Sequence, residues 1–362
     1  MLDFIPLDQY TPLFYYALLA LTAGIFLHSY LTNMESPGSI KIIRNTALFL
    51  FLGTIFYMGL RPVSGQYFGD MAIYAKRFNR YQQGFTIIAT KDVAFQLFIK
   101  VMALSSNMHI FFLTCAALYI VPLYKASKNF FSSYWGYGFI ILLASMSFWP
   151  YGTNGIRNGI ATSFFILALA YQNKHFFFVL LLVLSCAFHK SMLLPTLALT
   201  LTFLHNNPKS YFVAWFLAIP LSLAFEGFWE SFFGSFGFDE RFSYFTDDTY
   251  ADQFSRIGFR WDFLLYSATG VFAAWYFIYK KKYTDAFYYR LVNIFLLSNA
   301  FWVLVIRSSF SNRFAYLSWF MLGLVIIYPL LKNRLFERQH RVIGNILIIY
   351  FLFSFALNVV LS

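Results

Sequence analysis

Apolar runs of about twenty residues recur along this chain, separated by short polar connections. A helix of that length spans about 30 Å, which is the thickness of the hydrocarbon core of a bilayer. Only 12% of the residues are charged, whereas a soluble domain carries about a quarter and needs them to cover its water-facing surface. The runs therefore predict an all-α, polytopic integral membrane protein.

Twelve membrane-spanning helices are expected, and no polar stretch is long enough for a separate soluble domain. Two neighbouring runs, 175–189 and 190–205, are short for complete crossings, so the expected number lies between eleven and thirteen. The apolar segment 92–104 carries Lys100 and favours a helix at the membrane interface. We therefore expect one transmembrane domain over residues 1–362, with spans near 11–31, 45–61, 107–124, 131–149, 155–172, 175–189, 190–205, 211–226, 261–279, 287–306, 314–331 and 342–361.

Lysine and arginine are distributed unequally between the two sets of loops that alternate along the chain. One set carries fourteen cations and three acids, whereas the other carries thirteen cations and twelve acids. Positive loops remain in the cytoplasm, so the first set is predicted to be cytoplasmic and both termini external. Topology therefore accounts for the net charge of +12, and no nucleic-acid partner is expected.

The external loops are rich in arginine, whereas the cytoplasmic cations are mostly lysines. A planar guanidinium group binds diphosphates and carboxylates through two parallel hydrogen bonds. Two long external segments, 62–106 with its interfacial helix and 227–260, are expected to form a cap over a cavity. We therefore expect any chemistry on the external face, where the arginines are Arg61, Arg77, Arg80, Arg157, Arg241, Arg256, Arg260, Arg307 and Arg313.

The first external cluster runs from Gly59 to Tyr74. A predicted helix ends at Arg61, and a glycine-rich turn then presents Asp70 and Tyr74. Arg61 is a candidate ligand of an anionic lipid, and Asp70 is a candidate for orienting a hydroxyl group. An arginine that only anchors the helix end at the interface would also fit this pattern.

The second cluster, residues 151–159, opens an apolar run and contains Asn154 and Arg157. The N-terminus of a helix attracts anions, and a cation in the first turn opposes the helix dipole. Arg157 is thus poorly placed for helix stability but well placed if both it and the helix end bind a phosphate. An arginine that extends to the interface is the structural alternative.

The third cluster is His189-Lys190-Ser191, which lies between two apolar runs. An imidazole titrates near neutral pH and could carry a proton. It could equally hydrogen-bond the end of a broken helix, and the sequence leaves both interpretations open.

Two further clusters place arginine beside polar residues at helix ends. Arg260, Trp261 and Asp262 precede an apolar run, where the arginine and the acid could also form a local ion pair. Arg307 and Arg313 join two spans through polar residues, and such charges at membrane depth are costly unless they line a water-filled site. All five clusters map to the external face.

Segment 227–260 interleaves aromatic side chains with carboxylates. Aromatic faces stack on sugars while polar groups bind the hydroxyls, which is typical of a glycan site. Aromatic residues near an interface also form the ordinary belt of a membrane protein. Sugar binding is therefore one of two interpretations of this segment.

Several common catalytic motifs are missing from the sequence. There is no Walker A loop, HExxH or CxxC, and no carboxylate cluster indicates a divalent metal site. Cys115 and Cys186 lie in apolar runs and are expected to be core residues. We therefore expect neither a cofactor nor a metal, and the energy for any reaction must come from an activated substrate or an ion gradient.

In this order, the five clusters resemble the EpsG family of bacterial exopolysaccharide polymerases, which are relatives of the Wzy O-antigen and capsule polymerases. The resemblance covers roughly residues 55–320. Four residues separate Gly65 from Asp70, which is more than in the family's Gly-x-Asp element. The matching residues are Gly59, Arg61, Asp70 and Tyr74, then Arg157, Gly159, Ile160 and Ala161, then Ala187 to Ser191, Gly258 to Asp262, and Asn312 to Tyr316.

The resemblance implies a GT-C-like, metal-independent glycosyltransferase in the bacterial plasma membrane, with its active site facing the exterior. It implies that undecaprenyl-diphosphate-linked oligosaccharides serve as donor and acceptor, and that undecaprenyl diphosphate is released when repeat units are joined. Such a reaction needs cations for the leaving diphosphate, a group that orients or deprotonates a hydroxyl, and access from the lipid. Membrane lipid is an expected partner, and a chain-length regulator is left open.

On this hypothesis, the candidate site residues fall into three groups. The expected ligands of the diphosphate are Arg157, Arg307 and Arg313, followed by Arg260 and Arg61. The catalytic candidates are His189, as proton acceptor or hydroxyl orienter, and then Asp262 and Asp70. The candidate sugar-binding residues are Tyr74, Trp261, Tyr316 and Asn154.

Two other functions would use similar chemistry. A flippase or transporter of lipid-linked oligosaccharides would also bind diphosphate, but it would line a path through both halves of the membrane, often with internal repeats. The sequence has no such repeat and no matching set of cytoplasmic intramembrane arginines. An O-antigen ligase-type glycosyltransferase would differ from a polymerase only in its acceptor. Both functions remain alternatives.

Overall fold

The computed structural model describes residues 3–87, 92–225, 227–235, 258–308 and 311–360, and no strand occurs within these ranges. The chain is an all-α polytopic membrane protein, as predicted. Its contacts divide it into two compact units. Unit 1 is Met1–His189 with Leu330–Ser362, and unit 2 is Lys190–Pro329. The prediction of a single transmembrane domain is not tested by this division and stays a prediction.

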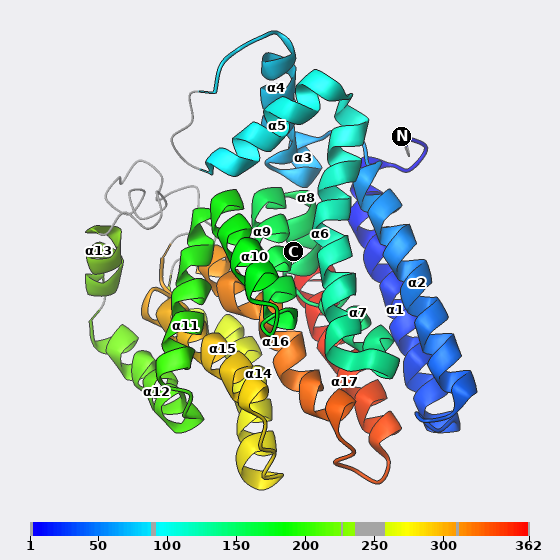
Figure 1. Ribbon diagram of the computed structural model, residues 1–362, viewed down its shortest axis with the longest axis vertical. Coiled ribbons are helices and arrows are strands. Elements are labelled where there is room, and N and C mark those ends of the chain that lie inside the picture. The colour runs from blue at the N-terminus through cyan, green and yellow to red at the C-terminus, as the bar shows by residue number, and fades with distance from the viewer. Residues whose placement is uncertain (1–2, 88–91, 226, 236–257, 309–310, 361–362) are drawn as a thin grey trace. The chain divides into compact units, whose positions relative to one another are not determined.

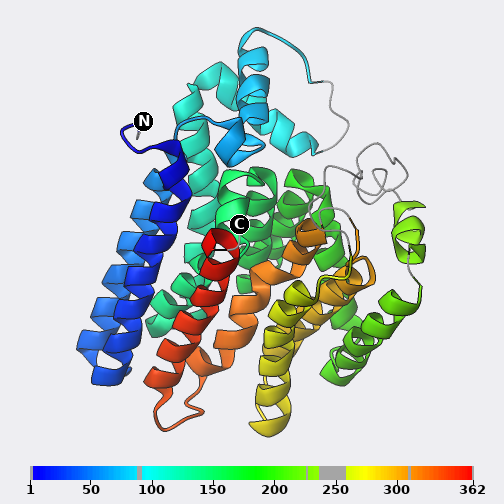
Figure 2. The same ribbon diagram turned by 180° about the vertical axis from the view of Figure 1, so that it is seen from behind.

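Unit 1 holds the N-terminal helices and the C-terminal helix. Within it, α1 packs on α17, α2 on α6, and α9 on both α6 and α10 (Figures 1 and 2). Its helices are α1 (Leu7–Leu31), α2 (Pro37–Gly59), α3 (Gly65–Phe68), α4 (Met71–Gln82), α5 (Val93–Ser105), α6 (Met108–Phe131), α7 (Trp135–Leu143), α8 (Phe148–Thr153), α9 (Ile156–Ala170), α10 (His175–Phe188) and α17 (Gln339–Phe355), with a 3-10 turn η1 (Ser132–Tyr134) and a final π turn η6 (Ala356–Val360).

Two glycines of the sequence clusters allow backbones in unit 1 to approach closely. A Cβ atom on Gly59 would lie 2.7 Å from the Cα of Leu113. A Cβ atom on Gly159 would lie 2.6 Å from the carbonyl oxygen of Tyr151. Small residues permit this approach between membrane helices, where packing replaces the hydrophobic effect as the driving force. These two glycines therefore allow α2 to approach α6 and α9 to approach α8.

Six helices of the described ranges are long and apolar enough to cross a membrane, by length and composition. They are Leu7–Leu31, Pro37–Gly59, Met108–Leu143, Ala286–Leu304, Ser311–Lys332 and Gln339–Val360. Four other apolar helices are shorter: Val93–Ser105, Ile156–Ala170, His175–Phe188 and Lys190–Leu204. A helix of fourteen residues, such as α10, is only about 21 Å long. Among the described residues, six single helices are therefore long enough to cross the membrane, which is fewer than the eleven to thirteen spans expected.

The expected spans 107–124 and 131–149 differ from the helices observed. Helix α6 continues to Phe131, and within this extension Nζ of Lys128 donates to the hydroxyl of Tyr124, one turn earlier, at 3.0 Å. Helix α7 then ends at Leu143, and α8 begins separately at Phe148. Pro150 lies in the first turn of α8, where a proline starts a helix readily but cannot continue a preceding one.

Segment 62–106, expected to be an external loop with one interfacial helix, contains three helices, α3, α4 and α5. Helix α5 corresponds to the expected interfacial helix 92–104. Helices α4 and α5 pack on each other, and the hydroxyl of Tyr81 donates to Oε1 of Gln96 at 3.0 Å. The role of this segment as a cap stays a prediction.

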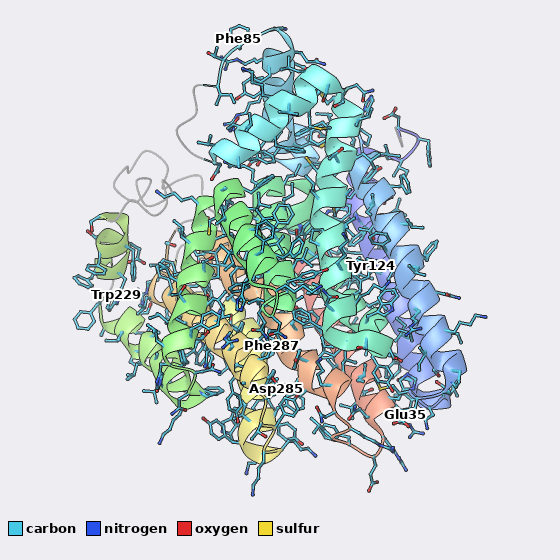
Figure 3. All side chains as sticks on the ribbon, in the orientation of Figure 1. Glu35, Phe85, Tyr124, Trp229, Asp285 and Phe287 are labelled. Carbon is cyan, nitrogen blue, oxygen red and sulfur yellow. The ribbon has the colours of Figure 1, made fainter. Side chains whose placement is uncertain are left out.

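Unit 2 is centred on α15, against which α11, α12 and α14 pack. Asp285, labelled in Figure 3, caps α15 by accepting the N–H of Tyr288 at 2.8 Å. The helices of this unit are α11 (Leu193–Leu204), α12 (Pro208–Ala224), α13 (Phe228–Ser235), α14 (Trp261–Trp275), α15 (Ala286–Leu304) and most of α16 (Ser311–Lys332), with a 3-10 turn η2 (Lys190–Met192) and a π turn η5 (Tyr276–Lys280).

A buried amide joins four helices of unit 2. Asn299 on α15 accepts the indole N–H of Trp215 on α12 at 2.7 Å and donates at 2.9 Å to the hydroxyls of both Ser267 on α14 and Ser318 on α16. Ser267 also accepts the indole N–H of Trp319 at 2.7 Å. Polar groups buried among membrane helices must be satisfied internally, and this network satisfies both ends of the Asn299 amide.

We expect Asn299→Ala to lower the free energy of unfolding by about 1–3 kcal/mol, because it leaves the buried indole N–H of Trp215 without its acceptor. Thermal unfolding of the purified protein in detergent measures the change. Asn45→Ala, on the exposed face of α2, is the control and should change stability by less than about 0.5 kcal/mol. Equal unfolding temperatures for the two variants would contradict the assigned role of the network.

Candidate functional site

Arg157 lies in the first turn of α9, as the sequence predicted, and no side chain caps this helix. Its NH1 group lies 2.5 Å from Oδ2 of Asp92, and its Nε donates to the hydroxyl of Tyr74 at 3.2 Å. The carboxylate thus provides the negative charge that a cation at a helix N-terminus needs. The Arg157 side chain is 28% exposed, so it is not fully enclosed.

Asp92 immediately precedes α5 and was not identified in the sequence analysis. Its backbone is left-handed (φ 50°, ψ 44°), a conformation that aspartate adopts more readily than most residues. Its carbonyl oxygen accepts the first N–H groups of the helix, from Phe95 and Gln96, whereas its carboxylate makes no capping bond. The carboxylate instead lies between Arg157 and His189 and is 6% exposed.

His189 ends α10 in an extended conformation, with its N–H bonded to the carbonyl oxygen of Ser185 at 3.1 Å. Its Nδ1 lies 3.3 Å from Oδ2 of Asp92. In a neutral imidazole that donates from Nδ1 to a carboxylate, the other nitrogen, Nε2, is left as the proton acceptor. The structure therefore places His189 at a break between helices and also beside a carboxylate that can orient it.

Tyr74 on α4 supports this cluster from a buried position. The side chain is 1% exposed, and its ring packs edge-on against Phe95 at a centroid distance of 5.3 Å. Burial raises the pKa of Tyr74 to about 12, so the phenol is protonated at neutral pH. Because its hydroxyl accepts from Arg157, Tyr74 fixes the direction of the guanidinium group.

The first two sequence clusters meet through Asn154. Its Oδ1 accepts the backbone N–H of Asp70 at 2.9 Å. The preceding Gly69 has a φ of +50°, and a Cβ atom there would lie 2.4 Å from the same oxygen. Only glycine fits this turn, which places the Asp70 side chain at the start of α4.

Arg61 is 2% exposed and binds main-chain oxygens of unit 1. It donates to the carbonyls of Met58 and Thr153, the latter at 3.0 Å. Its guanidinium carbon lies 5.4 Å and 5.8 Å from the ring centroids of Phe68 and Phe112. These contacts tie the end of α2 to the turn before α9, and binding of a diphosphate by Arg61 stays a prediction.

In unit 2, Arg260 and Asp262 form the local ion pair considered from the sequence. Nε and NH2 of Arg260 donate to the two carboxylate oxygens at 2.9 Å and 2.6 Å. Trp261 between them is 60% exposed, and its ring centroid lies 4.4 Å from that of Phe259. The guanidinium carbon of Arg307 lies 5.9 Å from the same Phe259 ring. The fourth cluster and the start of the fifth therefore lie together.

The remaining candidates lie on α16. Arg313 is in its first turn, and Tyr316 follows one turn later with 7% of its surface exposed. The ring centroid of Tyr316 lies 5.6 Å from that of Trp319. Their roles in binding diphosphate and sugar stay predictions.

Two expectations fall partly beyond these clusters. Most of the aromatic and acidic residues of segment 227–260 lie in 236–257, outside the described residues. Within the described residues, no group of three or more His, Cys, Asp or Glu side chains could hold a metal ion.

Asp92 could have been found only as an acid directly before an apolar run, and such a position in a sequence indicates a helix cap.

Fold and site define a polytopic helical membrane protein with an arginine, a histidine and a shared carboxylate at a helix start. Residues 44–362 match the model of the EpsG family. The chain belongs to this family, which is a family of polysaccharide polymerases. Searches of curated proteins and of solved structures found no match.

We expect Asp92→Ala to lower the free energy of unfolding by about 1–3 kcal/mol, because Arg157 would lose its carboxylate in a largely buried setting. A double-mutant cycle with Arg157→Ala should then give a coupling energy of about 0.5–3 kcal/mol, measured by unfolding in detergent.

The control for this cycle is the pair Glu35–Arg334, whose atoms lie 3.7 Å apart with side chains 57% and 65% exposed. An exposed pair of this kind should couple by less than about 1 kcal/mol. A coupling energy for Asp92 and Arg157 no larger than that of the control would show that the ion pair does not hold the cluster together.

Proposed function

We propose that this member of the EpsG family is a glycosyltransferase that joins undecaprenyl-diphosphate-linked oligosaccharide repeat units at the outer face of the bacterial plasma membrane. The observation that carries the proposal is the group formed by Arg157, Asp92 and His189 in a family of polysaccharide polymerases. This group combines a cation for a leaving anion with an oriented base, and the proposed reaction requires both.

In the proposed reaction, a hydroxyl oxygen of one glycan bonds to the anomeric carbon of a second, lipid-linked glycan. The bond between that carbon and the diphosphate oxygen breaks, and undecaprenyl diphosphate leaves with the electron pair. The hydroxyl proton passes to a base. Negative charge builds on the leaving oxygens, so cations that are already in place lower the barrier.

His189 is the proposed base. An imidazole that donates from Nδ1 to Asp92 carries its lone pair on Nε2, and this nitrogen is the proposed acceptor of the hydroxyl proton. As in other carboxylate–histidine pairs, the carboxylate then stabilises the imidazolium that forms. The same carboxylate bonds to Arg157, so proton transfer makes the cluster more positive while the diphosphate becomes more negative.

Arg157 is the proposed primary ligand of the diphosphate. Its side chain, which is 28% exposed, belongs to the first turn of α9, and the positive end of the helix dipole also favours an anion there. Arg307, Arg313, Arg260 and Arg61 remain further proposed ligands, and Asp70 and Asp262 remain further catalytic candidates. Tyr74, Asn154, Trp261 and Tyr316 remain the proposed sugar-binding residues, of which Trp261 offers the most exposed ring. In this proposal arginines supply the positive charge, so no metal is needed.

We expect Arg157→Ala and His189→Ala each to reduce the rate of polymer formation by at least about 100-fold, the usual range for losing a charge-stabilising donor or a general base. The assay uses purified protein in vesicles with lipid-linked repeat units and no ion gradient, and polymer length is followed on gels. Arg80→Ala, which removes an arginine that stacks on Phe85, should retain the wild-type rate.

Three results would contradict the proposal. Full polymer length with both Arg157→Ala and His189→Ala, at normal protein levels, would remove these residues from the reaction. Movement of lipid-linked units across the bilayer without polymer would indicate a flippase. Transfer only to an acceptor other than a second repeat unit would indicate a ligase.

A further inference from the structure

Unit 1 contains a cationic cleft where α2 begins and α6 ends, with a volume of about 700 Å³ (Figure 1). Three cations line it, Lys41 and Arg44 from α2 and Lys128 from α6. No acidic side chain of the described residues lines it, and the nearest acid in the sequence, Glu35, pairs with Arg334 at 3.7 Å. The cleft therefore carries a positive charge that its own lining does not neutralise.

The three cations retain hydrogen-bond donors for a ligand. Arg44 donates from Nε to the carbonyl oxygen of Ser133 at 3.3 Å, and its NH1 and NH2 groups make no hydrogen bond to the described part of the chain. Nζ of Lys128 donates one of its three protons to the hydroxyl of Tyr124. Lys41 makes neither a hydrogen bond nor an ion pair with any described residue. Phosphate oxygens accept hydrogen bonds from both kinds of side chain.

Contacts between helices fix the walls of the cleft relative to each other. The bond from Arg44 ties α2 to the turn η1 that follows α6. Next to it, the rings of Phe51 on α2 and Tyr124 on α6 stack at a centroid distance of 4.4 Å. A Cβ atom on Gly136 of α7 would lie 2.8 Å from Cγ2 of Ile43 on α2, so α7 also lies close against α2. The cleft is therefore formed by the packed helices themselves.

Both walls change from cationic to apolar in the same direction. Along α2 the lining runs from Lys41 to Leu48, and along the antiparallel α6 it runs back from Lys128 to Tyr124. Beside Leu48, which is 39% exposed, Phe49 is 69% exposed. A phospholipid has the same order of groups, with a phosphate followed by acyl chains. A small soluble anion would need only the cationic end.

The cleft lies far from the candidate site along α2. The part of this helix from Arg44 to Gly59, which belongs to the first sequence cluster, spans about 23 Å. This is most of the thickness of the hydrocarbon core, so the cleft and the candidate site belong to opposite leaflets. The cations of the cleft are in the set of loops predicted to be cytoplasmic. The positive-inside rule needs cations in those loops but does not require that they converge on one cleft.

We propose that this cleft binds one anionic phospholipid of the leaflet opposite to the candidate site. The phosphate lies at the three cations, and an acyl chain follows Leu48 and Tyr124. Basic pockets between membrane helices bind acidic headgroups in this way. A zwitterionic phospholipid has no net charge and complements three cations less well. The inference concerns a site apart from the candidate site and does not depend on the proposed function.

The first test measures which lipid binds. Native mass spectrometry of the purified protein in detergent compares phosphatidylglycerol with phosphatidylethanolamine of the same acyl chains. We expect one retained phosphatidylglycerol per chain, bound at least about fivefold more tightly than phosphatidylethanolamine. Glycerol phosphate lacks acyl chains and should not displace it at equal concentration. Equal affinity for the two lipids, or displacement by glycerol phosphate, would overturn the proposal.

The second test locates the bound lipid. Lys41→Gln and Lys128→Gln should each weaken phosphatidylglycerol binding about fivefold and leave phosphatidylethanolamine binding within about twofold of wild type. Lys41→Arg keeps the charge and should retain wild-type affinity. The control is Lys209→Gln, which removes an exposed cation at the start of α12, outside the lining, and it should stay within about twofold of wild type.

Two results of the second test would contradict the site. An equal loss by Lys209→Gln would show that total charge, rather than the cleft, attracts the lipid. Wild-type affinity in both Lys41→Gln and Lys128→Gln would remove the cleft as the place of binding. Lys41 makes no bond within the described residues, so Lys41→Gln should unfold at the wild-type temperature without added lipid, which separates lost binding from lost folding.

Discussion

The carboxylate of Asp92, shared between Arg157 and His189, is the contact on which the candidate site depends. A charged side chain in a water-poor setting is stable only when an opposite charge and hydrogen bonds accompany it. Arg157 stands at the positive end of a helix, which adds to this requirement. The carboxylate of Asp92 supplies the opposite charge that Arg157 requires and also orients the imidazole of His189. Asp92 also bonds to Arg157, which lies 65 positions later in the sequence, and to His189, which lies 97 positions later. The start of α5, the start of α9 and the end of α10 are therefore held as one group.

The sequence predicted the parts of the structure that depend on local patterns. Apolar runs of helical length predicted an all-α membrane protein, and the second cluster predicted that Arg157 lies in the first turn of a helix. Asp92 was missed because its partners are distant in sequence, and its local position indicates only a helix cap. Among the described residues, six helices are long enough by themselves, which is fewer than the eleven to thirteen spans expected. Turns such as that before Pro150 interrupt apolar runs without changing their composition.

The sequence clusters contain scaffold residues as well as residues suited to chemistry. Gly59 and Gly159 lie where a Cβ atom would meet another backbone, and Gly69 lies where it would meet Asn154. Arg61 is enclosed by carbonyl oxygens and aromatic rings. These residues shape the turns that surround α9, whereas the side chain of Arg157 remains 28% exposed. A motif match alone could not separate the two kinds of residue, because both are small or cationic and both occur at the ends of helices.

Unit 2 shows how a polar interaction can define an apolar surface. Helices in hydrocarbon gain little from the hydrophobic effect, so packing and buried hydrogen bonds decide which faces meet. Asn299 on α15 hydrogen-bonds Trp215 of α12 and Ser267 of α14. The faces of α12 and α14 that carry these two residues therefore turn toward α15. The outer aromatic faces are then left to line a groove. The same arrangement of helices leaves charges at both ends of that groove, with Arg260 next to Trp261 at one end and Lys280 over the ring of Trp275 at the other, whereas the lining between them is apolar.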